Sequence, residues 1–416
     1  MGSSAPSAWA SSTASPASPA TTPCPSNSRW TNWPWSAPPR STATPPTSWP
    51  PRRCTARRPS SRRSPRGRTR GRVAEPATPR YTAAGVDIAA NDRLIPRYRA
   101  LARSAGRPEV LGGVGAFSGL FDLSAFQDPV LVASTDGVGT KLLVARRLGR
   151  LDGVGRDIVN HCINDILTAG ARPLFFLDYL AGAGLGEDEK VAIVGGVAAA
   201  CADGGVALLG GETADMPGLY RDGDFDLAGT IVGVVRKGEE IDGGAIRPGD
   251  ALIGLPSNGL HTNGYTLARA VLRLDEAEPE RLLAPDAGLG GSLADALLAP
   301  HTAYWPALQP VLSRCKGIAH VTGGGIPGNV ARILPDACAA RLRRGAWPEP
   351  PIFERIRTAG EIGDEEMMRV FNLGLGLAVA VEAVDAADVL EALPGAAVVG
   401  KVEPRGDGPA VIVEPE

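Results

Sequence analysis

The chain has 416 residues, which is enough for two domains with sizeable cores. It contains no apolar run of about 18 residues and no apolar stretch of roughly 7–15 residues near its start, so we expect neither a membrane span nor a secretory signal. The formal net charge of −2 is unevenly distributed, because residues 81–416 hold 30 basic and 44 acidic residues and follow a basic segment.

Residues 1–80 form this basic segment. They contain 13 Arg and 16 Pro but one acidic residue and no Leu, Ile, Phe or Tyr. Such a segment buries too little apolar surface to offset the entropy of ordering its backbone, so we expect a disordered extension. The basic run 52–72 could contact nucleic acid, and the Ser- and Arg-rich composition suits a transit peptide. An extension without either role is favoured, and no nucleic-acid partner is expected.

Six cysteines are scattered along the chain at positions 24, 54, 162, 201, 315 and 338. They form no CxxC pair and show no spacing typical of metal ligands. Reduced and mostly buried thiols in a cytoplasmic protein are the simplest interpretation.

The first half of the folded part alternates helices and strands. Apolar periodicity predicts helices over 86–104, 156–169 and 187–203, and strands over 130–134, 174–180, 206–209 and 226–235. The first strand is expected to end in a loop at 135–137 and the third in a loop at 210–213. Residues 81–242 are assigned to an N-terminal domain.

A similar layout begins again after the turn Pro248–Asp250. The predicted strands cover 251–255, 318–321, 374–382 and 398–402, and the predicted helices cover 265–274, a segment starting near Pro327, and 386–393. The domain boundary therefore lies near 240–248, and residues 243–416 form a C-terminal domain. Each domain mixes strands and helices, so the predicted fold class is α+β with two mixed α/β domains.

The string Ser134–Lys141 is the first candidate site. Asp136 ends a strand between residues of a glycine-rich turn that also contains Gly137, Gly139 and Thr140. Glycines let backbone N–H groups approach phosphate oxygens, and Lys141 adds positive charge. The pattern suits a metal and phosphate site, although a glycine-rich turn with a solvated Asp would look the same.

The helix over 156–169 carries Asp157, His161, Asn164 and Asp165 on one polar stripe. Two carboxylates and an amide can hold Mg²⁺, which prefers oxygen ligands, although an ordinary solvated helix face has the same pattern. Glu212 and Asp215 lie in a second acidic string, 210–218. Three acidic segments in one acidic domain would repel one another unless cations neutralise them, which favours metal–nucleotide binding.

Two kinds of glycine-rich segment complete the picture. Residues 111–119, which include Gly113 and Gly115, could form a flap over a nucleotide, although no Walker or Rossmann motif occurs. In the second half, the strings 257–265 and 322–325 each lie between a strand and a helix, where backbone N–H groups favour anions. His261 lies among small polar residues, so a functional role is preferred to core packing.

Together these strings resemble the phosphoribosylformylglycinamidine cyclo-ligase family, also called AIR synthetases. The agreement runs from Tyr81 to Val402 and is strongest over 134–141, 173–179, 210–218, 259–265, 320–325 and 371–372. Residues 1–80 have no counterpart in the family.

The resemblance implies a homodimer whose N-terminal sheets pair in a barrel, and an ATP-binding superfamily fold. It implies use of ATP and Mg²⁺ to convert formylglycinamidine ribonucleotide into 5-aminoimidazole ribonucleotide, ADP and phosphate in purine biosynthesis. The formyl oxygen would be phosphorylated to an iminophosphate, and the neighbouring amidine nitrogen would then expel phosphate. Catalysis of this kind consists mainly of positioning and charge stabilisation.

The residue patterns and the resemblance together assign roles to residues. The catalytic set is His261, Lys141 and Asp136. The nucleotide set is Gly113, Gly115, Asp136, Gly137, Gly139, Thr140, Lys141, Asn164, Asp165, Gly211, Glu212 and Thr213. The substrate set is Asn258, His261, Thr262, Asn263, Gly323, Gly324 and Gly325. The metal set is Asp136, Asp165, Glu212 and Asp215.

Two departures from the family pattern concern substrate handling. Arg99 stands where a Lys is common, and Arg cannot transfer a proton. His301 and Thr302 replace a Thr-Arg pair before Tyr304. The best alternative is another enzyme of the superfamily, such as a thiamine-phosphate kinase, but the string 259–265 argues against it.

Overall fold

The computed structural model describes residues 87–112, 114 and 117–415. The expected disordered extension over 1–80 and the nucleotide contacts assigned to Gly113 and Gly115 lie outside these residues. In the described part of the chain, no helix combines the length and the apolar character needed to cross a membrane.

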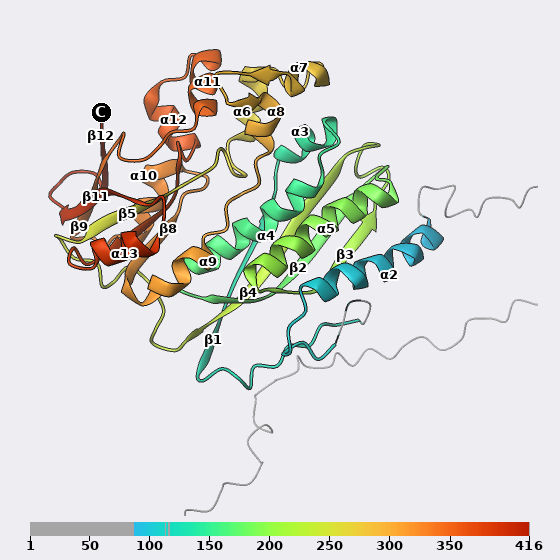
Figure 1. Cartoon of the computed structure of the whole chain (residues 1–416), viewed down its shortest axis with the longest axis horizontal. Coiled ribbons are helices and arrows are strands. Elements are labelled where there is room, and N and C mark those ends of the chain that lie inside the picture. Colours follow the sequence, from blue (N-terminus) through green and yellow to red (C-terminus); the bar gives the residue numbers. More distant parts are fainter. Residues whose placement is uncertain (1–86, 113, 115–116, 416) are drawn as a thin grey trace, which may run out of the picture. The chain divides into compact units, whose positions relative to one another are not determined.

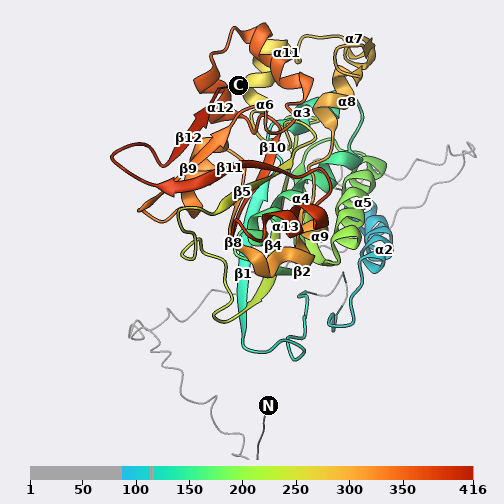
Figure 2. The same cartoon turned by 60° about the vertical axis from the view of Figure 1, so that its left-hand side comes forward.

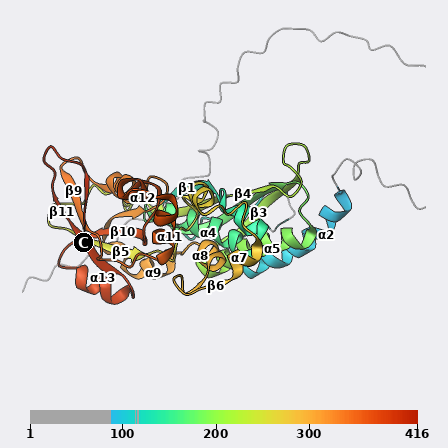
Figure 3. The ribbon, with the colours of Figure 1, turned by 90° about the horizontal axis from the view of Figure 1, so that it is seen from above.

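The first half is built on a four-stranded sheet with the order β1-β4-β2-β3 (Figure 1). Its strands are β1 (Pro129–Gly137), β2 (Arg172–Gly182), β3 (Ala207–Asp215) and β4 (Phe225–Arg236). Only β2 and β3 pair in parallel. The helices α2 (Ile88–Ser104), α4 (Asp152–Leu167) and α5 (Glu187–Gly204) gather on one side of this sheet, as the view from above shows (Figure 3).

The opposite face of this sheet stays open. Leu131 on β1 and Leu177 and Tyr179 on β2 have exposed fractions of 54%, 36% and 39%. The register pairs Thr135 with Thr230 and Thr230 with Leu177, so these residues share one face. The described residues therefore leave an apolar sheet face without a covering layer.

The second half contains a six-stranded sheet with the order β12-β9-β11-β5-β10-β8 (Figure 2). The strands are β5 (Ala251–Pro256), β8 (Cys315–His320), β9 (Cys338–Arg343), β10 (Leu375–Val381), β11 (Ala397–Pro404) and β12 (Val411–Glu414). All seven residues of β10 are buried, which identifies this strand as the centre of the second core.

Shorter elements surround this sheet. The helices are α6 (Tyr265–Leu272), α7 (Pro279–Leu283), α8 (Leu293–Leu298), α9 (Trp305–Leu308), α10 (Gly325–Val330), α11 (Pro351–Gly360), α12 (Asp364–Val370) and α13 (Ala386–Ala392). The 3₁₀ turns Gln309–Arg314 and Ala331–Ile333 and the small ribbon of β6 (Pro285–Asp286) and β7 (Gly291–Ser292) complete the half.

The structure confirms the predicted elements within a few residues but corrects two loops and one boundary. Residues 135–137 and 210–213 continue β1 and β3, because their backbones stay in the hydrogen-bonded ladder despite the glycines. Helix α4 begins at Asp152, four residues before the predicted start. The four described cysteines are buried and free, as expected.

Candidate active site

The polar stripe of α4 forms the centre of the site. Asp157, His161, Asn164 and Asp165 lie on one side of the helix, while the apolar stripe packs into the first core. Segments of the second half cover the polar stripe, so Asp157, His161 and Asn164 are at most 3% exposed. The expected solvated face is thus a buried interface between the two halves.

Lys141, the first residue of α3 (Lys141–Arg147), is fully buried. Its ammonium lies 2.9 Å from Asp157 Oδ1 and donates to the carbonyls of His261 (3.1 Å) and Ala299 (2.8 Å). Burial lowers the pKa of Lys141 and raises that of Asp157, while their mutual attraction favours both charged forms. Because its donors are used internally, Lys141 joins the two halves, and this geometry does not support the predicted phosphate contact.

Asn164 holds the segment 300–304 against α4. Its amide donates to the carbonyl of Thr302 (2.8 Å) and accepts from the backbone N–H of Tyr304 (2.9 Å). The backbone N–H of His301 donates to Asp157 Oδ1 at 2.7 Å. Asn164 therefore positions this segment, with its amide oxygen and nitrogen both bonded to the backbone of the second half.

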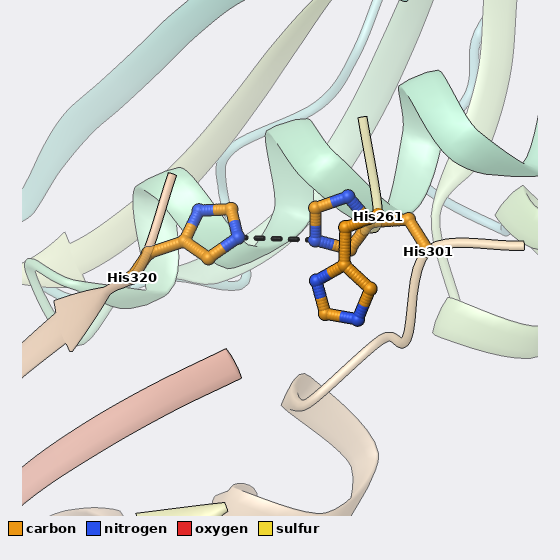
Figure 4. Close-up of side chains that lie close together, drawn as sticks. All are labelled: His261, His301 and His320. Atoms are coloured by element: carbon orange, nitrogen blue, oxygen red, sulfur yellow. Dashed lines mark hydrogen bonds between the residues drawn. The ribbon is translucent and has the colours of Figure 1, made fainter. Parts of the chain in front are cut away.

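The chain has four histidines, and all four gather beside α4. The ring centroids lie 5.2 Å apart for His161 and His301, 5.1 Å for His161 and His320, 5.1 Å for His301 and His320, and 3.9 Å for His261 and His301. Figure 4 shows three of them, with His261 stacked beside His301. His261 also holds a φ of +60°, a conformation that is uncommon outside glycine.

Two of these imidazoles contact the predicted metal-binding carboxylates. His161 Nε2 lies 2.9 Å from Asp136 Oδ2 and 3.6 Å from Asp165 Oδ2. His320 Nδ1 lies 2.9 Å from Asp165 Oδ1, and Thr262 Oγ1 lies 2.7 Å from His161 Nδ1. The structure therefore brings Asp136 and Asp165 together, as predicted, with His161 between them.

The electrostatics of the cluster follow from burial and from these contacts. The hydrogen bond from His161 lowers the pKa of Asp136. Burial raises the pKa of Asp165, but His320 and His161 outweigh it and leave the value below the ordinary range. Burial lowers the pKa of His161, but the two carboxylates raise it above the ordinary value. Burial holds the pKa below the ordinary value for His261, His301 and His320.

A cavity of about 650 Å³ opens beside this cluster, between the two halves. Asp136 and Asp165 line it from the first half, and Asn263 and Gly323 line it from the second. Arg332 adds a cation to the wall. The cavity therefore offers carboxylates that can hold a metal ion and a guanidinium that can hold an anion. This combination suits a phosphorylated ligand.

A second cavity, of about 720 Å³, lies within the first half. Gly211, Glu212 and Thr213 of β3 line it together with Tyr98 of α2 and Asp178 of β2. Burial raises the pKa of Asp178 to about 7, and the neighbouring Glu212 adds to the shift. The predicted nucleotide-side residues of β3 therefore gather around a cavity of their own.

The residues of the predicted metal set do not lie together. Asp136 and Asp165 line the cavity between the halves, whereas Glu212 lines the cavity within the first half. The register places Asp136, Gly229, Asp178 and Gly211 in one row across β1, β4, β2 and β3. With strands about 4.8 Å apart, three steps separate β1 from β3 by about 14 Å, so their carboxylates cannot share one cation. Asp215 also forms an ion pair with Lys190 at 2.6 Å.

The remaining predicted residues have mainly structural contacts. Thr140 Oγ1 lies 3.2 Å from Thr266 Oγ1, and the Asn258 amide donates to the carbonyl of Pro300. The backbone N–H of Gly137 donates to Asp136 Oδ1, and Gly139 has a φ of +72°. Gly324 and Gly325 form the start of α10 and, unlike Gly323, lie outside the lining of the cavity between the halves.

Three residues at the site received no role from the sequence. His320 lay within the matching string 320–325, and His301 was noted only as a departure from the family pattern. Arg332 lies in the 3₁₀ turn after α10, outside every motif recognised in the sequence. The scarcity of histidine was the available signal, because four imidazoles in 416 residues meet at one place.

Comparison with known proteins identifies the family. A model described as "AIR synthase related protein, N-terminal domain" matches residues 121–235, and its C-terminal counterpart matches residues 247–413. The phosphoribosylformylglycinamidine cyclo-ligase of Myxococcus xanthus is 50% identical over 341 residues, covering 80% of this chain and 98% of the relative. The chain belongs to the phosphoribosylformylglycinamidine cyclo-ligase family.

Other members of the cyclo-ligase family are similarly close. The Aromatoleum aromaticum enzyme of the same name is 47% identical over 340 residues, which cover 79% of this chain and 96% of the relative. The family resemblance expected from the sequence is confirmed.

Solved structures share the fold of the superfamily. A thiamine-monophosphate kinase from Stenotrophomonas maltophilia aligns with a TM-score of 0.56 at 22% identity, covering 77% of this chain and 95% of that one. The hydrogenase maturation protein HypE, solved in complex with ATP, aligns with a TM-score of 0.57 at 18% identity, covering 78% and 91%. At these identities the likeness establishes the two-domain α/β architecture alone.

Proposed function

We propose that the chain closes the imidazole ring of 5-aminoimidazole ribonucleotide, using ATP and formylglycinamidine ribonucleotide and releasing ADP and phosphate. The match to curated cyclo-ligases over nearly their whole length supports this activity. The structural observation that carries it is the cavity of about 650 Å³, where carboxylates of one half face Arg332 of the other. This polarity suits a phosphorylated substrate and a transferring phosphoryl group.

The chemistry requires activation of a poor leaving group. Transfer of the γ-phosphoryl group to the formyl oxygen gives an iminophosphate, and attack by the amidine nitrogen on that carbon closes the ring and releases phosphate. The walls of the cavity would hold the reacting groups close together and exclude water, which accounts for much of the acceleration in reactions of this kind.

Mg²⁺ fits the carboxylates that face this cavity. The Asp136 side chain is 45% exposed, and Asp165 lies beside it, which provides the oxygen ligands that Mg²⁺ prefers. Bound there, the ion would offset negative charge on the phosphates. Asp136, the more exposed of the two, would hold it directly, while Asp165, whose side chain is 26% exposed and anchors His320, would contribute mainly charge.

The histidines would act on the substrate side. His261 is 1% exposed and does not line the cavity, so it would act through the stacked His301 and through the backbone that it holds. His320 lines the cavity itself and is anchored by Asp165, which orients its ring. His261 therefore has a positioning role in this proposal, and His320 is the imidazole that faces the substrate.

ATP would occupy the first half beside β3. The 720 Å³ cavity offers apolar walls from α2 together with the polar groups of Glu212 and Thr213. Its residues include the nucleotide-side string predicted from the sequence. HypE, which shares this fold, has been solved in complex with ATP.

We also propose a cytoplasmic homodimer. The open face of the first sheet presents Leu131, Leu177 and Tyr179, and pairing two such faces would remove apolar surface from water. The acidic body favours a small-molecule enzyme over a nucleic-acid-binding protein.

The decisive experiment is incubation of the full chain with formylglycinamidine ribonucleotide, ATP and Mg²⁺. Aminoimidazole ribonucleotide, ADP and phosphate should appear in equal amounts, and omission of either substrate should abolish all three. A parallel reaction with thiamine monophosphate tests the alternative. Formation of thiamine diphosphate without aminoimidazole ribonucleotide would reject the proposed activity.

A further inference from the structure

Three buried imidazoles share one small space at the interface between the halves. One ring nitrogen from each of His261, His301 and His320 lies within 4.8 Å of the other two, and the residues are 1%, 1% and 5% exposed. They come from the loop after β5, from the segment before α9 and from the end of β8 (Figure 4). No contact described so far explains why three imidazoles converge.

The hydrogen-bond partners determine which nitrogen of His320 carries its proton. Asp165 Oδ1 accepts only, so His320 Nδ1, 2.9 Å away, must donate to it. The other nitrogen, Nε2, then presents a lone pair. An imidazole whose Nδ1–H is held by a carboxylate has the arrangement commonly found behind a metal-bound histidine.

The hydrogen bonds of His161 and Thr262 lead in turn to His301. His161 Nε2 donates to Asp136, so in a neutral ring its Nδ1 accepts the hydroxyl proton of Thr262. The Thr262 oxygen lies 3.4 Å from His301 Nδ1 and 3.5 Å from the Asn263 amide nitrogen, so it does not fix which nitrogen of His301 carries the proton. His301 Nε2 lies 3.0 Å from the Nε2 lone pair of His320, and without an ion it donates a hydrogen bond to it.

A cation at this contact would take both Nε2 lone pairs, with the proton of His301 moved to its Nδ1. Without an ion His261 stays unsatisfied, because within the described chain neither ring nitrogen of His261 has a hydrogen-bond partner and both are buried. A buried polar atom without a partner is costly, and a metal ion would use one of these nitrogens.

We propose that His261, His301 and His320 bind one divalent transition-metal ion, with Asp165 as the carboxylate that orients His320. Imidazole nitrogens suit Zn²⁺, Co²⁺ or Ni²⁺, whereas Mg²⁺ prefers oxygen ligands. Two Zn–N bonds of about 2.05 Å at a tetrahedral angle separate their nitrogens by about 3.3 Å, close to the 3.0 Å seen here. His261 must turn out of its stack on His301 to direct a nitrogen at the ion.

Such an ion would join three segments of the second half and, through Asp165, link them to α4 of the first. It lies behind the wall of the cavity that His320 lines, so the site is separate from the oxygen-lined position proposed for Mg²⁺. The proposal does not depend on the activity of the enzyme.

The test uses the full chain without a histidine tag, stripped with a chelator and titrated with Co²⁺ and then Zn²⁺. One ion per chain should bind at this site, and Co²⁺ should give the visible absorption of a tetrahedral complex. His301→Gln should weaken binding at this site by at least about a hundredfold, and Asp165→Asn by about 10- to 100-fold. Because Cys24 and Cys54 could also bind metal, the difference between each variant and the unaltered chain is the measured quantity.

His161→Gln is the matched control, because it makes the same change in the one histidine of the cluster outside the ligand set. It should retain affinity within about tenfold. If His161→Gln loses the ion while His301→Gln keeps it, the ligands are His161, Asp165 and His320, the other group of possible ligands, and the proposal is wrong. It is also wrong if the unaltered chain binds no more Co²⁺ or Zn²⁺ than His301→Gln. Circular dichroism checks folding, and His320→Gln replaces any variant that unfolds.

Discussion

Asp136 and Asp165 differ in how much of each carboxylate remains for a ligand. Both carboxylates accept hydrogen bonds, but the Asp136 side chain is 45% exposed and the Asp165 side chain is 26% exposed. At the scale of single residues, the site therefore combines a more accessible carboxylate with one that is more enclosed and anchors His320. An Asp→Asn change should therefore lower Mg²⁺-dependent turnover at both positions, but only at Asp165 should it also disturb His320.

Asp136→Asn should reduce Mg²⁺-dependent turnover by on the order of a hundredfold, because it removes a charged ligand of the ion. Asp165→Asn should have a similar effect on turnover and should also disturb His320. The double variant should lose less than the product of the two single losses, because both residues act on one ion. Steady-state rates across a Mg²⁺ titration measure this, and strictly multiplicative losses would argue against a shared ion.

Lys141 and Asp157 form a buried pair whose members depend on each other. Lys141→Met should lower the free energy of unfolding by about 3–5 kcal/mol, because it leaves the Asp157 carboxylate buried without its cation. The double variant Lys141→Met, Asp157→Leu should recover part of this loss. Denaturant unfolding of the three proteins gives the values, and a double variant less stable than Lys141→Met would contradict the interpretation.

Asp178 gives the protein a predictable pH dependence. Its folded-state pKa of about 7 lies above the ordinary value of 3.8, so the folded protein holds this proton more tightly than the unfolded chain. Its contribution to stability is therefore complete below about pH 4 and declines as the pH rises to about 7. The free energy of unfolding of Asp178→Asn should therefore fall less over this pH range than that of the unaltered chain, by up to a few kcal/mol. Urea unfolding at pH 5 and pH 8 compares the two proteins, and equal pH slopes would disprove the assignment.

At the scale of elements, α4 and α5 approach each other through two glycines. A Cβ at Gly155 would clash with the Ile193 carbonyl, and one at Gly196 would clash with the Asp152 carbonyl. This close approach fixes the position of α4 on the sheet, and with it the position of the polar stripe that carries the site.

Gly155→Ala should therefore destabilise the protein by about 1–3 kcal/mol, because the added methyl group must push the two helices apart. Gly195→Ala is the matched control on α5, since its Cβ would meet only Leu101 Cδ2 at 4.0 Å. It should be neutral or stabilising by up to about 1 kcal/mol, because Ala favours the helix more than Gly. Equal losses for the two variants, measured by thermal unfolding, would show that helix separation is not the cause.

The elements were largely predictable from the sequence, but the environment of their polar residues was not. The spacing of Asp157, His161, Asn164 and Asp165 correctly places them on one face of a helix. It cannot indicate that residues more than a hundred positions later cover this face, because periodicity carries no information on long-range packing. The same limit concealed the His301–His320 contact, and the glycines in 210–213 suggested a loop where the parallel ladder continues.

At the scale of the whole molecule, the open face of the first sheet makes a homodimer the expected state. Leu131, Leu177 and Tyr179 are exposed on adjacent parts of this face, while the helices bury the other. Such an apolar sheet face is stable in water when a second layer covers it, and a second copy of the chain supplies an identical face.

Leu131→Glu tests this arrangement. In a symmetric pair it places a carboxylate from each copy at an apolar interface, which costs several kcal/mol and should weaken dimerisation by at least about a hundredfold. Leu283→Glu is the matched control, because Leu283 is 49% exposed, against 54% for Leu131, and lies in the second half. Light scattering after size-exclusion chromatography should give a dimer for the unaltered chain and for Leu283→Glu, and a monomer for Leu131→Glu at low micromolar concentration. Retention of the dimer in Leu131→Glu would place the contact elsewhere, whereas a monomeric unaltered chain would leave the apolar face exposed and reject the dimer itself.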